Sequence, residues 1–106
     1  MMIRTETEAS FTKAVIDLAH VFKWRCAHFR PARTAQGWRT PVQGDGAGFP
    51  DLVLVRRRTI IVAELKVGKN RPTLDQQKWL DVFREAGVRT YLWRPEMWNE
   101  IESILR

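Results

Sequence analysis

The sequence predicts a single mixed α/β domain that spans residues 1–106. A chain of 106 residues fits one compact domain. Hydrophobic residues make up 44% of the chain and charged residues 28%, which is typical of a globular fold rather than of a disordered segment. Segments with a helical period alternate with short runs rich in Val, Ile and Leu, so helices and strands are expected in one fold.

The first half of the chain predicts one helix, one short strand and a long loop. Thr5 and Glu8 fit a capping box at the start of a helix over residues 8–24. Residues 25–29 are consistent with a short strand leaving that helix. Residues 31–49 are rich in Gly and Pro and predict a loop, which at this length is more often functional than idle. One helical face carries the apolar residues Phe11, Val15, Leu18, Ala19 and Phe22.

The second half predicts three strands and two helices. Residues 51–55 and 59–66 are dense in Val, Ile and Leu, which favours two strands. Thr73 and Gln76 form a second capping box before a helix that ends at Gly87. Residues 88–93 predict a third strand, and a short helix follows Pro95. The helix that starts after Thr73 is expected to carry the apolar stripe Leu74, Trp79, Leu80 and Phe83. Trp79, Trp93 and Trp98 are expected in the core.

Charge and composition favour a nucleic-acid partner. The formal net charge is +6, with arginine in excess, and this suggests a polyanionic ligand. No apolar run approaches the about 18 residues of a membrane span, and the N-terminus lacks an apolar signal core, so a cytoplasmic location without membrane contact is expected. One cysteine, Cys26, and two histidines, His20 and His28, make a zinc site improbable. No phosphate-binding glycine motif is present, so no nucleotide cofactor is expected.

Three charged residues lie at the ends of the two central strands. If residues 51–66 form an antiparallel hairpin that turns at Arg57-Arg58, Val53 pairs with Val62 and Asp51 falls opposite Glu64, with Cβ atoms about 4.5–5.5 Å apart. Lys66 is two residues beyond Glu64 and therefore points to the same face. Adjacent carboxylates repel unless a proton or cation lies between them, so the arrangement suits a hard divalent cation. The alternative is that Asp51 caps a loop and Glu64 and Lys66 form an ion pair at the sheet edge.

These residues resemble the PD-(D/E)XK nuclease pattern, in which Pro50-Asp51 supplies the PD and Glu64-x-Lys66 the ExK. More narrowly, residues 44–95 are similar to the VRR-NUC branch of that superfamily, and the first helix is similar more loosely. The branch is known from stand-alone phage and bacterial proteins and from the nuclease domain of a larger DNA-repair enzyme. Further matching features are a glycine before the PD, the helix pattern Thr73-x-x-Gln76-x-x-Trp79-Leu80, and the Gly87 turn into an apolar strand.

The resemblance implies a restriction-endonuclease-like fold, which is a central mixed β-sheet flanked by helices. It implies that Asp51 and Glu64 bind Mg²⁺ or Mn²⁺, and that the backbone carbonyl of Leu65 completes the site. Lys66 would orient or activate the attacking water and stabilise the transition state. Gln76 would support the site from the following helix.

The resemblance also assigns a residue of the first helix to the metal site. Glu8 matches the acidic residue that this family often adds there. Its position in the sequence is equally explained as the last member of a capping box with Thr5.

The sequence therefore predicts a metal-dependent DNA endonuclease, structure-specific for branched DNA such as four-way junctions or flaps, in DNA repair, recombination or phage DNA processing. The alternative is a non-catalytic DNA-binding module that retains the fold. A symmetric homodimer would place two sites on opposing strands. Arg56, Arg57 and Arg58 either bind phosphate or form a solvated turn, and Trp38 either stacks on a base or packs against the sheet. Contacts with the DNA backbone are expected from Arg30, Arg33, Arg39, Lys69 and Arg71.

Overall fold

The computed structural model describes residues 7–29, 32–34, 37–39 and 43–106. Its centre is a four-stranded sheet with the order β1-β4-β5-β6, formed by Arg25–His28, Leu52–Arg56, Thr59–Leu65 and Arg89–Trp93. β1, β4 and β5 are antiparallel neighbours, whereas β6 runs parallel to β5. The mixed sheet confirms the predicted restriction-endonuclease-like α/β fold.

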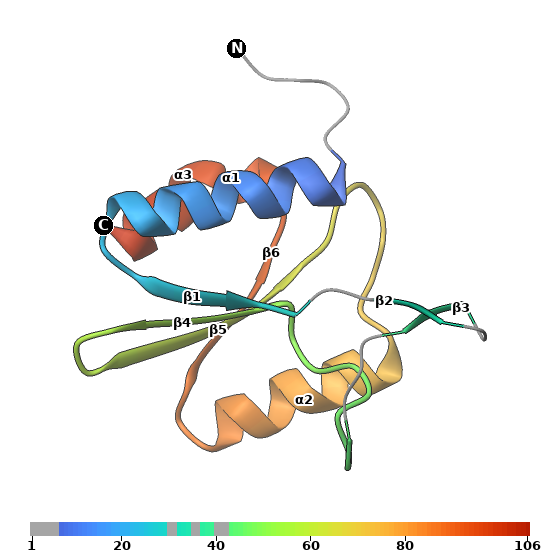
Figure 1. Cartoon of the computed structure of the whole chain (residues 1–106). Coiled ribbons are helices and arrows are strands. Elements are labelled where there is room, and N and C mark those ends of the chain that lie inside the picture. The colour runs from blue at the N-terminus through green and yellow to red at the C-terminus, as the bar shows by residue number, and fades with distance from the viewer. Residues whose placement is uncertain (1–6, 30–31, 35–36, 40–42) are drawn as a thin grey trace.

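Helices cover both faces of this sheet (Figure 1). α1 (Glu8–Val21) and α3 (Trp98–Leu105) lie together on one face, and α2 (Leu74–Glu85) lies on the other. A 3₁₀ turn, η1 (Pro95–Met97), leads from β6 into α3. No helix in the described part of the chain is long and apolar enough to cross a membrane.

The segment predicted as one long loop contains a small hairpin. β2 (Ala32–Thr34) pairs with β3 (Gly37–Arg39) in a separate two-stranded sheet, with Arg33 opposite Trp38. Strands of three residues are too short to show an alternating pattern, which is why the sequence predicted only a loop here. Residues 43–50 form turns without helix or strand.

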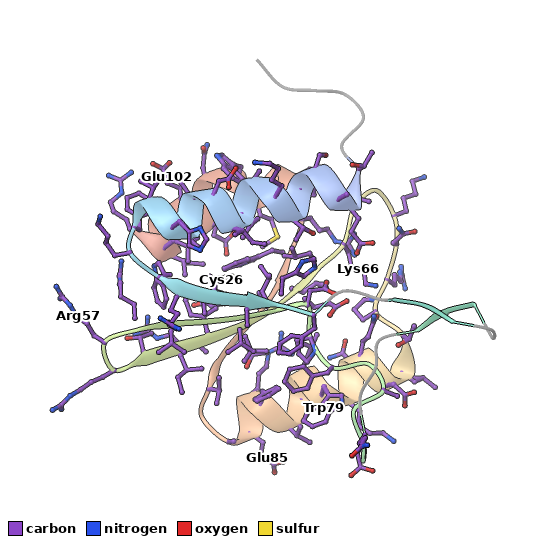
Figure 2. The ribbon with its side chains drawn as sticks, in the orientation of Figure 1. Cys26, Arg57, Lys66, Trp79, Glu85 and Glu102 are labelled. Atoms are coloured by element: carbon purple, nitrogen blue, oxygen red, sulfur yellow. The ribbon has the colours of Figure 1, made fainter. Side chains whose placement is uncertain are left out.

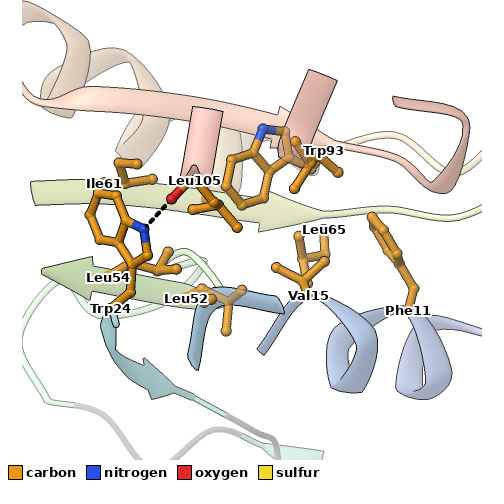
Figure 3. Packing of buried hydrophobic residues seen from close by; sticks show 12 residues of the cluster. Phe11, Val15, Trp24, Leu52, Leu54, Ile61, Leu65, Trp93 and Leu105 are labelled. Carbon is orange, nitrogen blue, oxygen red and sulfur yellow. Dashed lines mark hydrogen bonds between the residues drawn. The ribbon is translucent and has the colours of Figure 1, made fainter. Parts of the chain in front are cut away.

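The main core lies between the sheet and the α1–α3 layer. Alternate residues of β4 and β5 point to this layer and are fully buried against side chains of both helices (Figure 3). Trp24 closes one end, where its Nε1–H donates to the Leu105 carbonyl at 2.8 Å. The buried cluster consists of Phe11, Val15, Ala19, Trp24, Leu52, Leu54, Ile61, Ala63, Leu65, Trp93, Ile101 and Leu105. Trp93 is thus core, as predicted, and Trp98 packs against the cluster.

The start of α1 differs from the prediction. Thr7 is the N-cap: its Oγ1 accepts from the Ser10 N–H at 3.0 Å, and Ser10 Oγ accepts from the Thr7 N–H at 3.2 Å. The predicted Thr5–Glu8 capping box is therefore wrong, because Glu8 is the first helical residue and not the third. A serine in place of the usual Glu or Gln concealed the true box. The helix also ends at Val21, since Lys23 adopts a φ of 71°.

Both ends of α2 follow the predicted signals. Thr73 and Gln76 make the expected capping box. At the other end, Gly87 has a φ of 84° and its N–H donates to the Arg84 carbonyl. The Val88 N–H donates to the Phe83 carbonyl, and the two bonds form a Schellman motif. Leu74 was wrongly placed in the apolar stripe: it is 88% exposed, because it lies at the first position of the helix, away from the sheet.

Arg56 has a structural role at the end of β4. Its guanidinium lies 4.4 Å from the centroid of the Trp24 ring. Its Nη1 donates to the carbonyls of Phe22 at 2.9 Å and Leu105 at 3.0 Å, which are among the last carbonyls of α1 and α3. Arg56 thereby joins two helix C-termini to the sheet, whereas Arg57 and Arg58 are exposed at the turn.

We predict that Arg56→Ala lowers the free energy of unfolding by about 2 kcal/mol, because it removes charge-assisted hydrogen bonds and the contact with Trp24. Urea denaturation followed by far-UV circular dichroism measures the change. Arg58→Ala, at the exposed turn, is the matched control and should change stability by less than about 0.5 kcal/mol. Equal effects of the two substitutions would contradict the structural role of Arg56.

Candidate active site

The hairpin register places Asp51 opposite Glu64, as predicted. The observed pairs include Val53 with Val62 and end at Leu52 with Ala63, so the next pair of positions is Asp51 and Glu64. Asp51 Oδ2 accepts a hydrogen bond from the Leu65 backbone N–H at 2.9 Å. This bond holds the Asp51 carboxylate at the end of β5, beside the Glu64 side chain.

The turn that sets this register is made without glycine. Arg57, the first residue of the two-residue turn, adopts a φ of 57°, which L-residues other than Gly, Asn and Asp rarely take. The apolar strands on either side determine the pairing, because a slip by one residue would move the core residues of β4 to the opposite face. Glu64 reaches the α2 face by the same alternation that buries Ala63 and Leu65 in the core.

Gly48 brings the chain close to α2 just before Asp51. Its φ is 79°, and a Cβ atom at this position would lie 2.6 Å from the carbonyl carbon of Asp75 and 2.7 Å from the backbone nitrogen of Gln76. Both the positive φ and the close backbone contact require glycine. The glycine before the PD motif therefore sets the path by which the chain enters β4.

Glu64 is the most unusual charged residue among those described. It is 1% exposed, and neither of its carboxylate oxygens accepts a hydrogen bond within the described part of the protein. Its nearest cation is Lys66, whose Nζ lies 3.4 Å from Oε2. Buried carboxylates normally have hydrogen-bond partners, since an unpaired one costs several kcal/mol. Among the described residues, these oxygens therefore have the Lys66 ammonium as an ion-pair partner but no hydrogen-bond donor.

Burial and neighbouring charges shift the acidity of both carboxyl groups. Desolvation, and then the negative charge of Asp51, raise the pKa of Glu64 to about 7, although Lys66 opposes the shift. Burial also raises the pKa of Asp51, against the opposing effects of the Leu65 N–H bond and Lys66. Each carboxylate thus lacks enough positive charge around it when both are ionised, which is the electrostatic setting of a cation site.

The donor set fits a hard divalent cation. Asp51 and Glu64 offer adjacent carboxylate oxygens, which are the ligands that Mg²⁺ and Mn²⁺ prefer. Within the described ranges, no group of three or more His, Cys, Asp or Glu side chains gathers as a metal site. Glu8 is exposed at the start of α1, yet its negative charge contributes to the raised pKa of Glu64. The structure therefore brings together two of the three predicted acidic residues and places the third within electrostatic range.

Lys66 is fixed by the backbone on both sides. Its N–H donates to the Trp93 carbonyl at 3.0 Å, and its side chain is only 13% exposed. Arg94 then holds the segment after β5, because its guanidinium donates to the carbonyls of Gly68 at 3.1 Å and Asn70 at 2.6 Å. Nothing in the sequence indicated this role for Arg94, since backbone carbonyls as acceptors leave no pattern of residue types.

The remaining predicted residues that are described lie on α2, on the segment before it and on the β2–β3 hairpin. Gln76 uses its Oε1 to accept from the Thr73 N–H at 2.9 Å, so its carbonyl oxygen caps α2. Lys69 and Arg71 are exposed on the segment between β5 and α2. Arg33 is a residue of β2 and Arg39 a residue of β3, and Arg30 lies outside the described residues.

A cluster of aromatic rings lies between the Gly-rich segment and α2. Phe49 contacts Phe29, Trp79 and Phe83 edge to face, with ring centroids 5.2, 5.1 and 5.8 Å apart. Trp79 is half-buried here and is not part of the main core. The prediction that it is a core residue is therefore wrong. Figure 2 shows Trp79 on α2 and Lys66 near the end of β5. Single aromatic residues in Gly-rich sequence gave no signal for such a cluster.

A mixed sheet between two helical layers, with paired carboxylates and a lysine at the end of its central hairpin, defines a restriction-endonuclease-like nuclease domain. The family model of the VRR-NUC domain matches residues 16–95. This is more than half of the sequence, and the chain belongs to the VRR-NUC domain family. No curated protein sequence matched the chain. The family is a nuclease-type DNA-processing domain, which implies DNA as the substrate.

We predict that Gly48→Ala lowers the free energy of unfolding by at least about 2 kcal/mol, because the methyl group adds a backbone clash to the strain of a positive φ. Gly44→Ala is the matched control: its φ is 67°, but a Cβ there meets nothing within 4 Å. The control should lose only about 1 kcal/mol, from the φ strain alone. Equal losses in urea denaturation would show that the approach to α2 is not constrained.

Glu64 should make the metal-free protein less stable as pH rises. Its pKa rises on folding from 4.5 to about 7, so the folded protein binds the proton more tightly in this range. The free energy of unfolding should therefore fall between about pH 4.5 and 7, by up to about 3 kcal/mol from this group. In a chelator, Glu64→Gln should be more stable than the parent at pH 8 and similar to it near pH 4. Parallel stability curves for parent and variant would refute this, and the exposed Glu85→Gln is the control.

Proposed function

We propose that this protein is a metal-dependent DNA endonuclease with Asp51, Glu64 and Lys66 at its catalytic centre. The observation that carries the proposal is the buried Glu64 carboxylate, which accepts no hydrogen bond within the described residues and lies beside Asp51 and Lys66. A carboxylate in this state destabilises the fold when it is ionised, and a divalent cation would compensate it. Membership of a nuclease-type family agrees with this chemistry.

Asp51 and Glu64 would hold Mg²⁺ or Mn²⁺, together with the Leu65 backbone carbonyl and, from α1, Glu8. When bound, such an ion supplies a Lewis acid for the scissile phosphate and lowers the pKa of a coordinated water. Mg²⁺ accepts few protein ligands and keeps several waters, so two or three carboxylates suffice. The Leu65 N–H fixes the Asp51 carboxylate through Oδ2, so this group would be held in place as a ligand.

Lys66 provides the fixed positive charge of the site. Its ammonium group is held near Glu64 and mostly shielded from solvent, so its field is weakly screened. There it orients the attacking water and stabilises the negative charge that develops on the phosphate oxygens. Gln76 is proposed to support the site from α2, whose first turn lies against Gly48.

The DNA backbone is proposed to lie across the exposed basic residues next to this centre. Lys69 and Arg71 project from the segment that Arg94 holds in place. Arg33 and Arg39, on β2 and β3, and Arg30 are the further proposed phosphate contacts. The net charge of +6 supports attraction to a polyanion.

Branched DNA, such as four-way junctions or flaps, is the proposed substrate, within DNA repair, recombination or phage DNA processing. A symmetric homodimer would present two centres to opposing strands. The competing function is a DNA-binding module without catalysis. The buried carboxylate pair favours the enzyme, because a binding module gains nothing from a group that lowers its stability.

The test is cleavage of labelled four-way, flap and linear DNA with Mg²⁺, with Mn²⁺ and with a chelator. We expect cleavage only with the ions, and Asp51→Asn, Glu64→Gln and Lys66→Met should each reduce the rate by at least about 100-fold. Asp17→Asn, an exposed carboxylate on α1, is the control and should retain the parental rate.

Three outcomes would contradict parts of the proposal. DNA binding without cleavage in either ion would favour the non-catalytic module, and cleavage that survives Asp51→Asn would refute the site. Sedimentation of the same samples measures the mass: a monomer on junction DNA would refute the dimer.

A further inference from the structure

An aromatic pocket opens beside the proposed catalytic centre. Its volume is about 410 Å³, within the range of small-molecule sites. We define the aromatic pocket by its lining residues, which come from the end of β1, from the segment before β4, and from α2: Phe29, Gln43, Asp45, Gly46, Phe49 and Trp79.

The rings of the pocket are held in place by packing and hydrogen bonds. Phe49 lies centrally and contacts Phe29 and Trp79 edge to face. Trp79 Nε1–H donates to the Asp45 carbonyl at 2.9 Å, and the Phe49 N–H donates to the Gly46 carbonyl at 3.0 Å. Phe29 is 37% exposed, and Phe49 and Trp79 are half-buried. The pocket is therefore largely formed before any ligand enters.

Two of these rings are attached directly next to Asp51. The Phe29 N–H donates to the Asp51 carbonyl at 3.0 Å, and Phe49 precedes Asp51 by two residues. Two residues of chain span at most about 7 Å. Successive nucleotides of one strand rise about 3.4 Å, so this distance corresponds to about two nucleotides. A strand whose phosphate lies at Asp51 thus brings its neighbouring bases to the pocket.

The chemistry of the pocket matches a base and not a phosphate. Among the described residues that line it, none is Lys or Arg, and Asp45 would repel an anion. Aromatic faces stack on bases of any sequence, and the Gln43 amide and Asp45 carboxylate provide donors and acceptors for a base edge. Lys69 and Arg71 lie on a different segment, between β5 and α2, so backbone and base would have separate contacts.

We propose that the aromatic pocket receives an unstacked nucleobase of the DNA strand, within about two nucleotides of the phosphate at Asp51. This inference rests on the proposed function, since it takes the Asp51 centre as the place where the strand binds. Extruding a paired base costs a few kcal/mol, whereas an unpaired base costs least. The pocket therefore selects DNA with unpaired nucleotides, such as flaps and branch points, over continuous duplex.

The experiment measures dissociation constants in a chelator, so that no strand is cut. The probes are two flap DNAs that differ only in the single-stranded arm, which carries either normal bases or abasic residues. The parent should bind the abasic arm about 5- to 150-fold more weakly, the range expected for loss of one base–aromatic stack. Phe29→Leu, which keeps an apolar side chain without a ring face, should show the same loss on the normal arm and no further loss on the abasic arm.

Matched variants separate stacking from general disruption. Phe29→Tyr keeps the ring and should bind like the parent, and Val21→Ala, which changes an exposed apolar residue remote from the pocket, should also be unchanged. Circular dichroism establishes that each variant is folded. If Phe29→Leu does not fold, the affinities of the parent protein for the two flap DNAs provide the test. Equal affinity for the two arms overturns the proposal, and weaker binding of the abasic arm supports it.

Other outcomes overturn the proposal directly. Parental affinity in Phe29→Leu, or an equal loss on both arms, would show that no base stacks on Phe29. A change of sedimentation mass in Phe29→Leu without a change in DNA affinity would identify the pocket as a contact between copies of the chain. Base-dependent binding without cleavage in Mg²⁺ would refute the nuclease proposal and support the base-binding pocket. Cleavage without base dependence would support the nuclease proposal and refute the base-binding pocket.

Discussion

The hydrogen bond from the Leu65 N–H to Asp51 Oδ2 is the interaction on which the site depends. It joins the first residue before β4 to the last residue of β5, at the open end of the central hairpin. Because β5 also pairs with β6, this end of the hairpin is tied to the middle of the sheet. Side chains held by a sheet keep their relative positions better than side chains on loops, and catalysis requires such positioning.

The cost of this arrangement falls on Glu64. The strand alternation that gives β5 its buried core residues also buries Glu64 on the opposite face, where its oxygens accept no hydrogen bond among the described residues. Lys66 compensates only part of the charge, and the pKa of Glu64 remains raised to about 7. The rest of the fold offsets this cost: the main core packs α1 and α3 against one face of the sheet, and Arg56 ties their C-termini to β4.

The two faces of the sheet thus have different roles. The α1–α3 face holds most of the buried apolar side chains and supplies the stability of the domain. The α2 face carries Glu64, the close approach of Gly48 to α2, and the aromatic cluster around Phe49. Residues that the sequence placed in the core by their hydrophobicity, such as Trp79 and Leu74, lie on this second side half-buried or exposed. Hydrophobicity alone does not tell which face of a sheet will be closed.

The sequence by itself determined the α/β class, the order of the main elements, the hairpin register that brings Asp51 to Glu64, and the capped start and end of α2. These features follow from local patterns: alternation in strands, capping boxes, and a glycine at a helix end. Only the tertiary structure decided the true cap of α1, the β2–β3 hairpin, the structural roles of Arg56 and Arg94, and the aromatic pocket next to Asp51. The α1 cap and the β2–β3 hairpin are local, but a serine in the capping box and strands of three residues leave weak patterns. Arg56, Arg94 and the pocket depend on contacts between residues distant in the chain, several of them to backbone carbonyls, and such contacts leave no pattern in the residue types.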